Sequence, residues 1–189
     1  MKLYIRNMAC ESCKVIVRDS LEKLKLHPVK VALGEAEIKE EIGEEKKEKL
    51  NKMIREAGLE IIESKGSILI EQMRHGIYEY VHSPKPPSVN LSDYLSKKLG
   101  YDYNYLSNVF SDVEANTITN YMNSLKVERA KEMLLFEDLT LTEIAEKLHY
   151  SNLSHFSAHF KKITGLPPSH FRKLKDKRRK TIQEINSVN

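Results

Sequence analysis

The pair of cysteines near the N-terminus is the feature of this 189-residue chain best suited to chemistry. Cys10 and Cys13 are its only cysteines, and they lie three positions apart in the segment Met8-Ala9-Cys10-Glu11-Ser12-Cys13. We expect Cys10 on a loop and Cys13 in the first turn of a helix, where the positive end of the helix dipole lowers the pKa of a thiol. Two soft thiolates at this spacing predict a site for Cu(I) or another thiophilic metal. A disulfide between them, which would make the pair a redox switch, is the alternative.

Positive charge gathers near the other end of the chain. The sequence carries 31 Lys/Arg against 27 Asp/Glu, and the excess lies in its second half. Residues 161–180 hold nine Lys/Arg and a single Asp. A concentrated basic segment attached to a folded domain is typical of proteins that bind a polyanion. For the residues after about 175, a solvated tail with no binding role is an equally good interpretation.

A pattern of a short helix, a turn and a second helix occurs twice in the second half. Its copies run from Leu91 to Phe110 and from Leu141 to Phe160, at an offset of 50 residues. In the second copy, the small residue Ala145 allows the two helices to cross closely, and larger apolar residues are expected to fill the core: Ile144, Leu148, Phe156 and Phe160. This is the arrangement of a helix-turn-helix unit, whose second helix enters the major groove of DNA. A helix predicted over residues 119–135 is long enough to hold the two units apart.

The second copy and its flanks carry a longer motif. Phe156-x3-Phe160-Lys161-Lys162-x2-Gly165-x2-Pro168-x2-Phe171-Arg172, preceded by Ala145 and by Arg129-Ala130-x3-Leu134-Leu135, resembles the DNA-binding domain of the AraC family of bacterial transcription regulators. The resemblance covers residues 88–180. It implies a regulator that inserts two recognition helices into adjacent major grooves near promoters, with double-stranded DNA and RNA polymerase as partners.

The resemblance also assigns DNA-contacting positions. The base-reading positions of the family correspond here to Asn104, Ser107, Asn108, Leu153, Ser154 and Ala158. None is Arg or Lys, so these positions cannot make a bidentate Arg–guanine contact, whereas Asn pairs with adenine and Leu153 can touch a thymine methyl group. Phosphate contacts are expected from Lys161, Lys162 and Arg172.

Three positions depart from the family pattern. In the first unit, Ser111-Asp112 replaces a usual pair of basic residues and Ala115 replaces a usual glycine. In the second unit, His149-Tyr150 replaces the usual Gly-Phe of the turn. We therefore expect weak phosphate contacts from the first unit and a less tight turn in the second.

The first 62 residues alternate between strand and helix patterns. Strands are predicted at 2–6, 29–33, 36–38 and 59–62, and helices at 12–26 and 44–57. The first helix has Val15, Val17, Leu21 and Leu24 broadly on one side. The resulting βαββαβ order is that of the ferredoxin-like, split-βαβ arrangement, so the fold class is an α+β domain followed by an all-α double helix-turn-helix domain.

This order, with the Met8-Ala9-Cys10-Glu11-Ser12-Cys13 loop after the first strand, resembles heavy-metal-associated domains. The resemblance implies metal binding at Cys10 and Cys13, with Met8 in the core under the loop. Leu59 stands where metal chaperones of that family commonly carry a Tyr or Lys near the thiolates. A domain kept only for contacts with other molecules is the alternative.

A further helix is predicted over residues 67–82, with an apolar stripe of Leu69, Met73, Ile77 and Tyr80 or Val81. We expect this stripe to pack on the neighbouring sheet, and a homodimer contact is the alternative. The Pro-rich segment 84–87 then predicts a spacer between domains. The expected organisation is a ferredoxin-like domain at 1–66, a helix and linker at 67–87, a DNA-binding domain at 88–180 and a tail at 181–189.

Several classes of protein are excluded by the sequence. We find no nucleophile–base set and no phosphate loop, so we predict that the chain is not an enzyme. Apolar runs stay well below the roughly 20 residues of a membrane span, and no leader pattern opens the chain, so we expect a cytoplasmic protein. His155 and His159 are spaced as a metal pair, although a DNA-facing role is favoured. The predicted function is a sequence-specific transcription regulator. The alternatives are a metal-trafficking or metal-buffer protein with a basic helical module, and a redox-sensing regulator.

Overall fold

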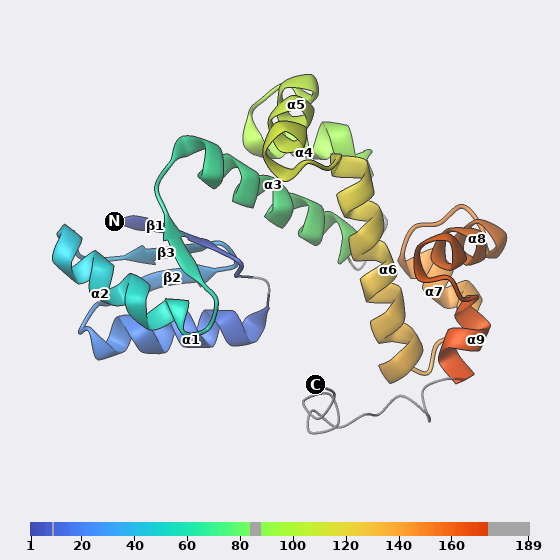
Figure 1. The fold of residues 1–189 in the computed structure, drawn as a ribbon, viewed down its shortest axis with the longest axis horizontal. Helices are drawn as coiled ribbons and strands as arrows, with labels where there is room; N and C mark the ends of the chain where they lie inside the picture. Colours follow the sequence, from blue (N-terminus) through green and yellow to red (C-terminus); the bar gives the residue numbers. More distant parts are fainter. Residues whose placement is uncertain (9, 84–87, 174–189) are drawn as a thin grey trace, which may run out of the picture. The chain divides into compact units, whose positions relative to one another are not determined.

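The structure is a computed structural model that describes residues 1–8, 10–83 and 88–173 (Figure 1). The described strands are β1 (Lys2–Arg6), β2 (Pro28–Ala32), β3 (Glu35–Ile38) and β4 (Glu60–Ile62). The described helices are α1 (Glu11–Lys23), α2 (Glu44–Arg55), α3 (Lys65–Val81), α4 (Leu91–Leu99), α5 (Tyr103–Glu114), α6 (Ile118–Phe136), α7 (Leu141–Lys147), α8 (Leu153–Thr164) and α9 (Pro168–Lys173). The predicted linker segment 84–87 and the tail 181–189 lie outside the described residues.

The described residues form two compact units. One contains Met1–Ile77 together with Ser92–Ala115, and the other contains Tyr78–Leu91 together with the residues from Asn116 onward. The first of these compact parts therefore holds the N-terminal sheet and the first predicted helix-turn-helix unit. The second compact part holds the second helix-turn-helix unit. Among the described residues, no helix is both long enough and apolar enough to cross a membrane.

An antiparallel sheet of four strands, in the order β2-β3-β1-β4, is the centre of the N-terminal part. β1 is a middle strand, and it pairs with β3 through Leu3 and Ala36 and with β4 through Ile5 and Ile61. Leu3 and Ile5 are buried, whereas the alternate residues Lys2, Tyr4 and Arg6 are more exposed, as the alternation in the sequence predicts.

Helices α1 and α2 cover one face of this sheet, and their apolar side chains complete its core (Figure 1). The core contains Val17 and Leu21 from α1 and Leu50 and Ile54 from α2. The predicted order of strands and helices is confirmed, with helix ends that differ from the prediction by at most three residues. The placement of Val15 on the apolar side of the first helix is wrong, because its side chain is 51% exposed.

Helix α3 packs against the first predicted helix-turn-helix. Its Gly76 lies so close to α4 that a Cβ atom there would be 2.8 Å from Cδ2 of Leu95. A larger residue at this position would force the Leu95 side chain to move, so this glycine allows the close contact. Arg74 of α3 also forms an ion pair with Glu114 of α5. The expectation that this helix packs only on the sheet was therefore incomplete, and helical packing begins before the predicted boundary at residue 88.

A second apolar core joins α6, α7, α8 and α9. Its fully buried members are, among others, Val127, Ala130, Ile144, Leu148, Phe156 and Phe160, and Phe171 of α9 packs against them. The core residues predicted from the sequence for this unit, including Ala145, are confirmed. Polar caps fix the ends of its helices: Thr140 and Glu143 form a capping box at the start of α7, and Gly165 ends α8 in a left-handed conformation.

Candidate nucleic-acid interface

One side of helix α8 is buried in the core of its domain and the other side is exposed, as contact with DNA through this helix requires. Phe156 and Phe160 are fully buried, with edge-to-face ring contacts to one another and from Phe160 to Phe171. Because a helix repeats every 3.6 residues, anchoring these two positions turns the opposite side outward. Of the predicted DNA-contacting residues of this helix, four are exposed on that side: Ser154, Ala158, Lys161 and Lys162. Leu153, three residues before Phe156, lies nearer the buried side and is 37% exposed.

Helix α5 occupies the same position in the first unit. Leu106 and Phe110 are fully buried, at the positions of Phe156 and Phe160. Asn104 and Asn108 are exposed and Ser107 is half-buried. The structure therefore places the polar side chains Asn104 and Asn108 on the outer side of α5, where they can meet base edges.

The two helices begin in the same way. The side chain of Asp102 accepts hydrogen bonds from the backbone N–H groups of Asn104 and Tyr105, at 2.8 and 3.4 Å. The side chain of Asn152, 50 residues later, accepts one from the backbone N–H of His155 at 2.8 Å. These caps satisfy donors that a helix start leaves without partners, and they fix the first turn of each recognition helix.

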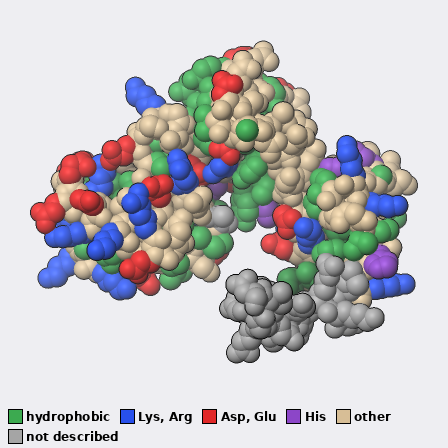
Figure 2. Space-filling view, in the orientation of Figure 1, with side chains coloured by type: hydrophobic (Ala, Val, Ile, Leu, Met, Phe, Trp, Pro, Cys, Tyr) green, Lys and Arg blue, Asp and Glu red, His purple; other side chains and the backbone are tan. Residues whose placement is uncertain are grey.

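The charges of the two helices differ. Lys161 and Lys162 are exposed near the end of α8, whereas α5 contains no Lys or Arg and has Asp112 exposed near its end. In the view of Figure 2, Lys, Arg and His side chains appear over α7, α8 and α9. In the first helix-turn-helix unit, the exposed lysines Lys97 and Lys98 lie on α4 and not on α5. Electrostatic attraction to phosphate therefore favours α8 over α5.

Two of the residues that depart from the family pattern, Ala115 and His149, have an unusual backbone conformation. Ala115, at the end of α5, has φ 48°, and His149, in the turn before α8, has φ 59°. Both are left-handed conformations that favour glycine, because a Cβ atom is then crowded by the backbone. Both residues therefore store backbone strain.

Tyr150 connects the turn of the second helix-turn-helix unit to the helices α6 and α8. Burial raises the pKa of Tyr150 to about 12, so the phenol keeps its proton and can donate to Nδ1 of His159, 2.7 Å away. On the other side, Nζ of Lys126 from α6 lies 5.0 Å from the centre of the Tyr150 ring, a cation–π contact. Lys126 is only 9% exposed, and burial lowers its pKa. These contacts position α8, and sequence reasoning missed them although it noted the His-Tyr replacement.

The histidines of this unit have separate surroundings. The Nδ1 of His155 is 3.1 Å from Oγ of Ser151, whereas that of His159 faces Tyr150. The two ring nitrogens of His149 are buried and, among the described residues, have no hydrogen-bond partner. Burial lowers the pKa of both His149 and His159. Within the described residues, no group of three or more His, Cys, Asp or Glu side chains is arranged to hold a metal ion.

Arg172 is bound within its own domain. Its Nη2 donates to the carbonyl oxygen of Leu139 at 2.6 Å, and its side chain is half-buried. The bond ties α9 to the segment between α6 and α7. Contact with a phosphate, as predicted from the resemblance, would have to use the other N–H groups of this side chain.

The cysteine pair lies at the start of α1, as predicted. Cys10 is the residue before the helix and is exposed, Cys13 is half-buried, and their Sγ atoms are 3.1 Å apart. Hydrogen bonding from Cys13, through its side chain and its backbone, lowers the pKa of the Cys10 thiol. Met8 is 5% exposed and packs in the core, which confirms its predicted place. The donor set, two soft sulfur atoms with one acidified thiol at the surface, suits a thiophilic metal ion.

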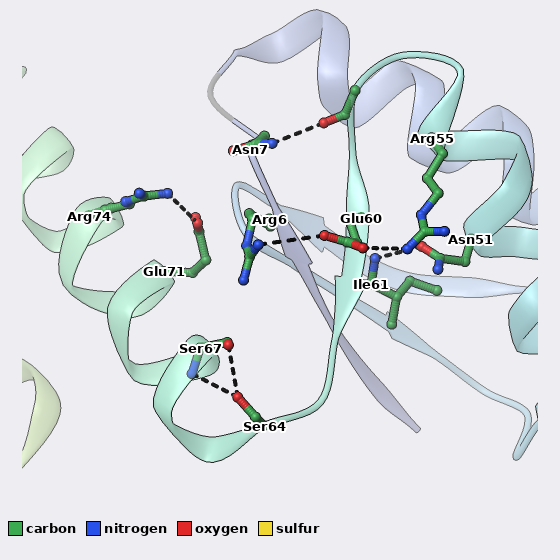
Figure 3. A network of polar contacts seen from close by, with 11 residues as sticks. Arg6, Asn7, Asn51, Arg55, Glu60, Ile61, Ser64, Ser67, Glu71 and Arg74 are labelled. Carbon is green, nitrogen blue, oxygen red and sulfur yellow. Dashed lines mark hydrogen bonds and ion pairs between the residues drawn. The ribbon is translucent and has the colours of Figure 1, made fainter. Parts of the chain in front are cut away.

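Polar contacts surround the strand that leads to this loop (Figure 3). Asn7, directly before Met8, donates to the carbonyl oxygen of Gly58 at 3.1 Å. Arg6 pairs with Glu60 of β4 at 3.6 Å, and the nearby charge of Arg6 also acts on Glu71 of α3. Charge–charge interactions therefore extend from Arg6 in the sheet through Glu71 to Arg74 in α3.

Comparisons with known proteins agree with this geometry. Residues 95–174 match a family described as a helix-turn-helix domain. The uncharacterized HTH-type transcriptional regulator YtdP of Bacillus subtilis is 35% identical over 83 residues, which are 44% of this chain but only 11% of that relative. The chain thus spans about a tenth of the length of that regulator.

Two solved structures share the helical fold. An AraC-type DNA-binding-domain transcriptional regulator from Chromobacterium violaceum superposes with a TM-score of 0.50 and 16% identity, over 61% of this chain and 99% of its own. The DNA-binding domain of AdpA, solved in complex with a target DNA, gives a TM-score of 0.51 and 14% identity, over 59% and 97%. The C-terminal helices of this chain therefore form a helix-turn-helix domain and share the fold of these two structures.

Proposed function

We propose that this chain is a sequence-specific transcription regulator that places α5 and α8 in adjacent major grooves of duplex DNA. One observation carries the proposal. Two helices 50 residues apart have a side-chain cap, a pair of buried anchors and an exposed side at matching positions, and Asn104, Asn108 and Ser154 are exposed on that side. The DNA complex of AdpA supports a DNA-binding role for a domain of this fold.

The two units contribute differently. The first unit has exposed amides and no positive charge on α5, so it reads bases at Asn104, Ser107 and Asn108. The second unit has Lys161 and Lys162 at the end of α8, so it supplies phosphate contacts in addition to Leu153, Ser154 and Ala158. RNA polymerase and a second copy of the chain remain predicted partners.

Affinity measurements at fixed salt test this function. A sequence-specific regulator binds its best duplex about 10³- to 10⁷-fold more tightly than an unrelated duplex of the same length. We expect a ratio in this range for the full chain, with a duplex selected from a random pool as the specific site. A ratio near one, with the protein folded, would overturn the proposal.

We further propose that the N-terminal part is a ferredoxin-like, heavy-metal-associated domain that holds Cu(I) or another thiophilic ion at Cys10 and Cys13. The strand order β2-β3-β1-β4, the βαββαβ sequence of elements and the acidified, exposed Cys10 thiol support this assignment. When bound, such an ion would replace the thiol protons of Cys10 and Cys13.

The route from the cysteine loop to DNA would be helix α3. Only Glu63 and Ser64 separate β4 from this helix, and its Arg74 pairs with Glu114 at the end of α5. A change in the sheet can therefore bias the first recognition helix through contiguous contacts. Measuring DNA affinity with and without Cu(I) under reducing conditions tests this role. A metal buffer would bind the ion with unchanged DNA affinity.

A disulfide is the second candidate for the pair, because the Sγ atoms lie only 3.1 Å apart. In that case an oxidant would alter DNA affinity and Cu(I) would not. Comparing the reduced, the oxidised and the Cu(I)-loaded chain on the same duplex separates the two candidates.

A further inference from the structure

Two exposed tyrosines stack on one another beside the first recognition helix. Tyr101 and Tyr105 are 48% and 49% exposed, and their ring centres are 5.4 Å apart with an angle of 29° between the rings. Neither phenol hydroxyl has a hydrogen-bond partner among the described residues. Two large rings are thus held side by side at the surface with both hydroxyl groups available to a ligand.

The pair borders the face that is proposed to read bases. Residues three and four apart on a helix are neighbours, so Tyr105 lies next to Asn108 on α5, and Asn104 precedes it directly. The Asp102 cap, which accepts the N–H of Tyr105, fixes this residue in the first turn of the helix. A group at the rim of a recognition helix meets the sugar–phosphate chain that borders the groove.

The same two positions interact in the second unit. Ser151 and His155 lie 50 residues after Tyr101 and Tyr105, both are exposed, and Ser151 Oγ is 3.1 Å from Nδ1 of His155. His155 also occupies the same place relative to its cap, Asn152, as Tyr105 does to Asp102. Each unit therefore carries a mutually supported pair of hydrogen-bonding side chains at the edge of its recognition helix.

Helix α5 has a particular need for such donors. It contains no Lys or Arg, and its exposed Asp112 repels phosphate. Tyr and Ser side chains are common donors to DNA phosphates, and a hydrogen bond to a charged acceptor is stronger than one between neutral groups. An uncharged donor can fix the register of the helix without an ionic contact.

We propose that Tyr101 and Tyr105, with Ser151 and His155 at the matching positions, are phosphate-contacting residues that clamp both recognition helices to the DNA backbone. The first pair acts through uncharged hydroxyl donors. This inference rests on the proposed DNA binding and adds four contacts to it.

Salt dependence distinguishes an uncharged phosphate contact from an ionic one. Each Lys or Arg that neutralises a phosphate adds about 0.9 to the slope of log K against log salt, whereas a phenol releases no counterion. The full-length chain and its Tyr101→Phe, Tyr105→Phe and His155→Ala variants are titrated with two labelled duplexes of equal length. One duplex is selected from a random pool and the other is unrelated. Tyr4→Phe, in the sheet, is the matched control, and Lys162→Gln is the ionic comparison.

We expect each tyrosine variant to weaken binding to both duplexes about 3- to 10-fold, with an unchanged salt slope. His155→Ala also weakens both, Tyr4→Phe weakens neither, and Lys162→Gln makes the slope shallower by about 0.9. Affinities of Tyr101→Phe and Tyr105→Phe that stay within about twofold of the parent would overturn the inference. A loss confined to the selected duplex would overturn it too, because it would indicate base reading. If the parent chain binds neither duplex, the proposed function itself has failed.

Discussion

Arg74 of α3 and Glu114 at the end of α5 form an ion pair, with 2.5 Å between Nη2 and Oε2, although 40 residues separate them. Arg74 also pairs with Glu71 of its own helix at 2.7 Å. All three side chains are largely buried or half-buried. Since α3 follows the last strand of the sheet after two residues, one helix connects the cysteine-bearing domain with the first recognition helix.

Replacing Arg74 tests this connection. Arg74→Met removes the ion-pair partner of the partly buried Glu71 and Glu114, and burial already raises the pKa of Glu71. We expect a loss of about 1–3 kcal/mol in the free energy of unfolding, between the values for exposed and buried pairs. Urea denaturation of the full chain measures it. Arg55→Met, which removes a more exposed pair with Glu60 in the sheet, is the matched control and should cost less than about 1 kcal/mol. Equal losses for the two variants would contradict a special role for Arg74.

The left-handed end of α5 predicts a stabilising substitution. Ala115 has φ 48°, and Ala115→Gly removes the clash of its Cβ atom with the backbone. We expect the free energy of unfolding to increase by about 0.5–1 kcal/mol, after the cost of the greater flexibility of glycine in the unfolded chain is subtracted. Ala158→Gly, inside α8, is the opposite control and should cost about 1 kcal/mol. Thermal unfolding of both variants decides the matter, and destabilisation by Ala115→Gly would show that the backbone there is not strained.

The buried histidines of the second unit predict a loss of stability in mild acid. Burial lowers the pKa of His149 and of His159 below the ordinary value of 6.5. As the pH falls through 6.5, the unfolded chain binds protons that the folded chain still excludes, so the free energy of unfolding decreases. Glu40, whose pKa is lowered to about 2 by its contacts with His27, loses its contribution only below its ordinary pKa of 4.5. The window from pH 7.5 to 5.5 therefore reports on histidines.

We expect the melting temperature of the full chain to fall between pH 7.5 and pH 5.5. His159→Gln keeps an acceptor for the Tyr150 hydroxyl but cannot be protonated, so its melting temperature should fall less. His170→Gln, at an exposed histidine of the same domain, is the matched control and should behave as the parent does. An equal fall for His159→Gln and the parent would contradict the assignment.

The elements that the sequence predicted correctly depend on neighbours along the chain. Strand alternation in 2–6, helical spacing in 44–57 and the two helix-turn-helix patterns are local signals, and they predicted the βαββαβ order and the helices α5 and α8. The positions Asn108, Ser154 and Lys162 were assigned from the resemblance to the AraC family, and all three are exposed.

What the sequence did not predict depends on contacts between distant segments. Gly76 against Leu95, Arg74 against Glu114 and Arg172 against the carbonyl of Leu139 join residues that no local pattern relates. For that reason α3 was expected on the sheet alone. The Tyr150–His159 hydrogen bond had one local sign, the His-Tyr replacement of Gly-Phe in the turn. Its acceptor, His159, lies on α8, outside that turn.

The cysteine pair predicts metal uptake that depends on both sulfur atoms. Under reducing conditions the full chain should bind one Cu(I), and the double variant Cys10→Ser, Cys13→Ser should not, because a hydroxyl is a poor ligand for a soft ion. Met8→Leu is the matched control and should keep the site, since Met8 is a core residue. If the metal is a signal, loading should change DNA affinity about 5- to 150-fold. Absence of uptake would contradict the metal assignment.

Selection of duplexes from a random pool by the full-length chain, followed by sequencing, tests the central claim most directly. We predict two conserved sequence blocks centred about 10 base pairs apart, because two recognition helices on one face of DNA meet successive major grooves. Asn108→Ala should change one block and Ser154→Ala the other, whereas Lys162→Ala should lower the yield of all sequences and change neither block. A folded protein that enriches no sequence would contradict the account.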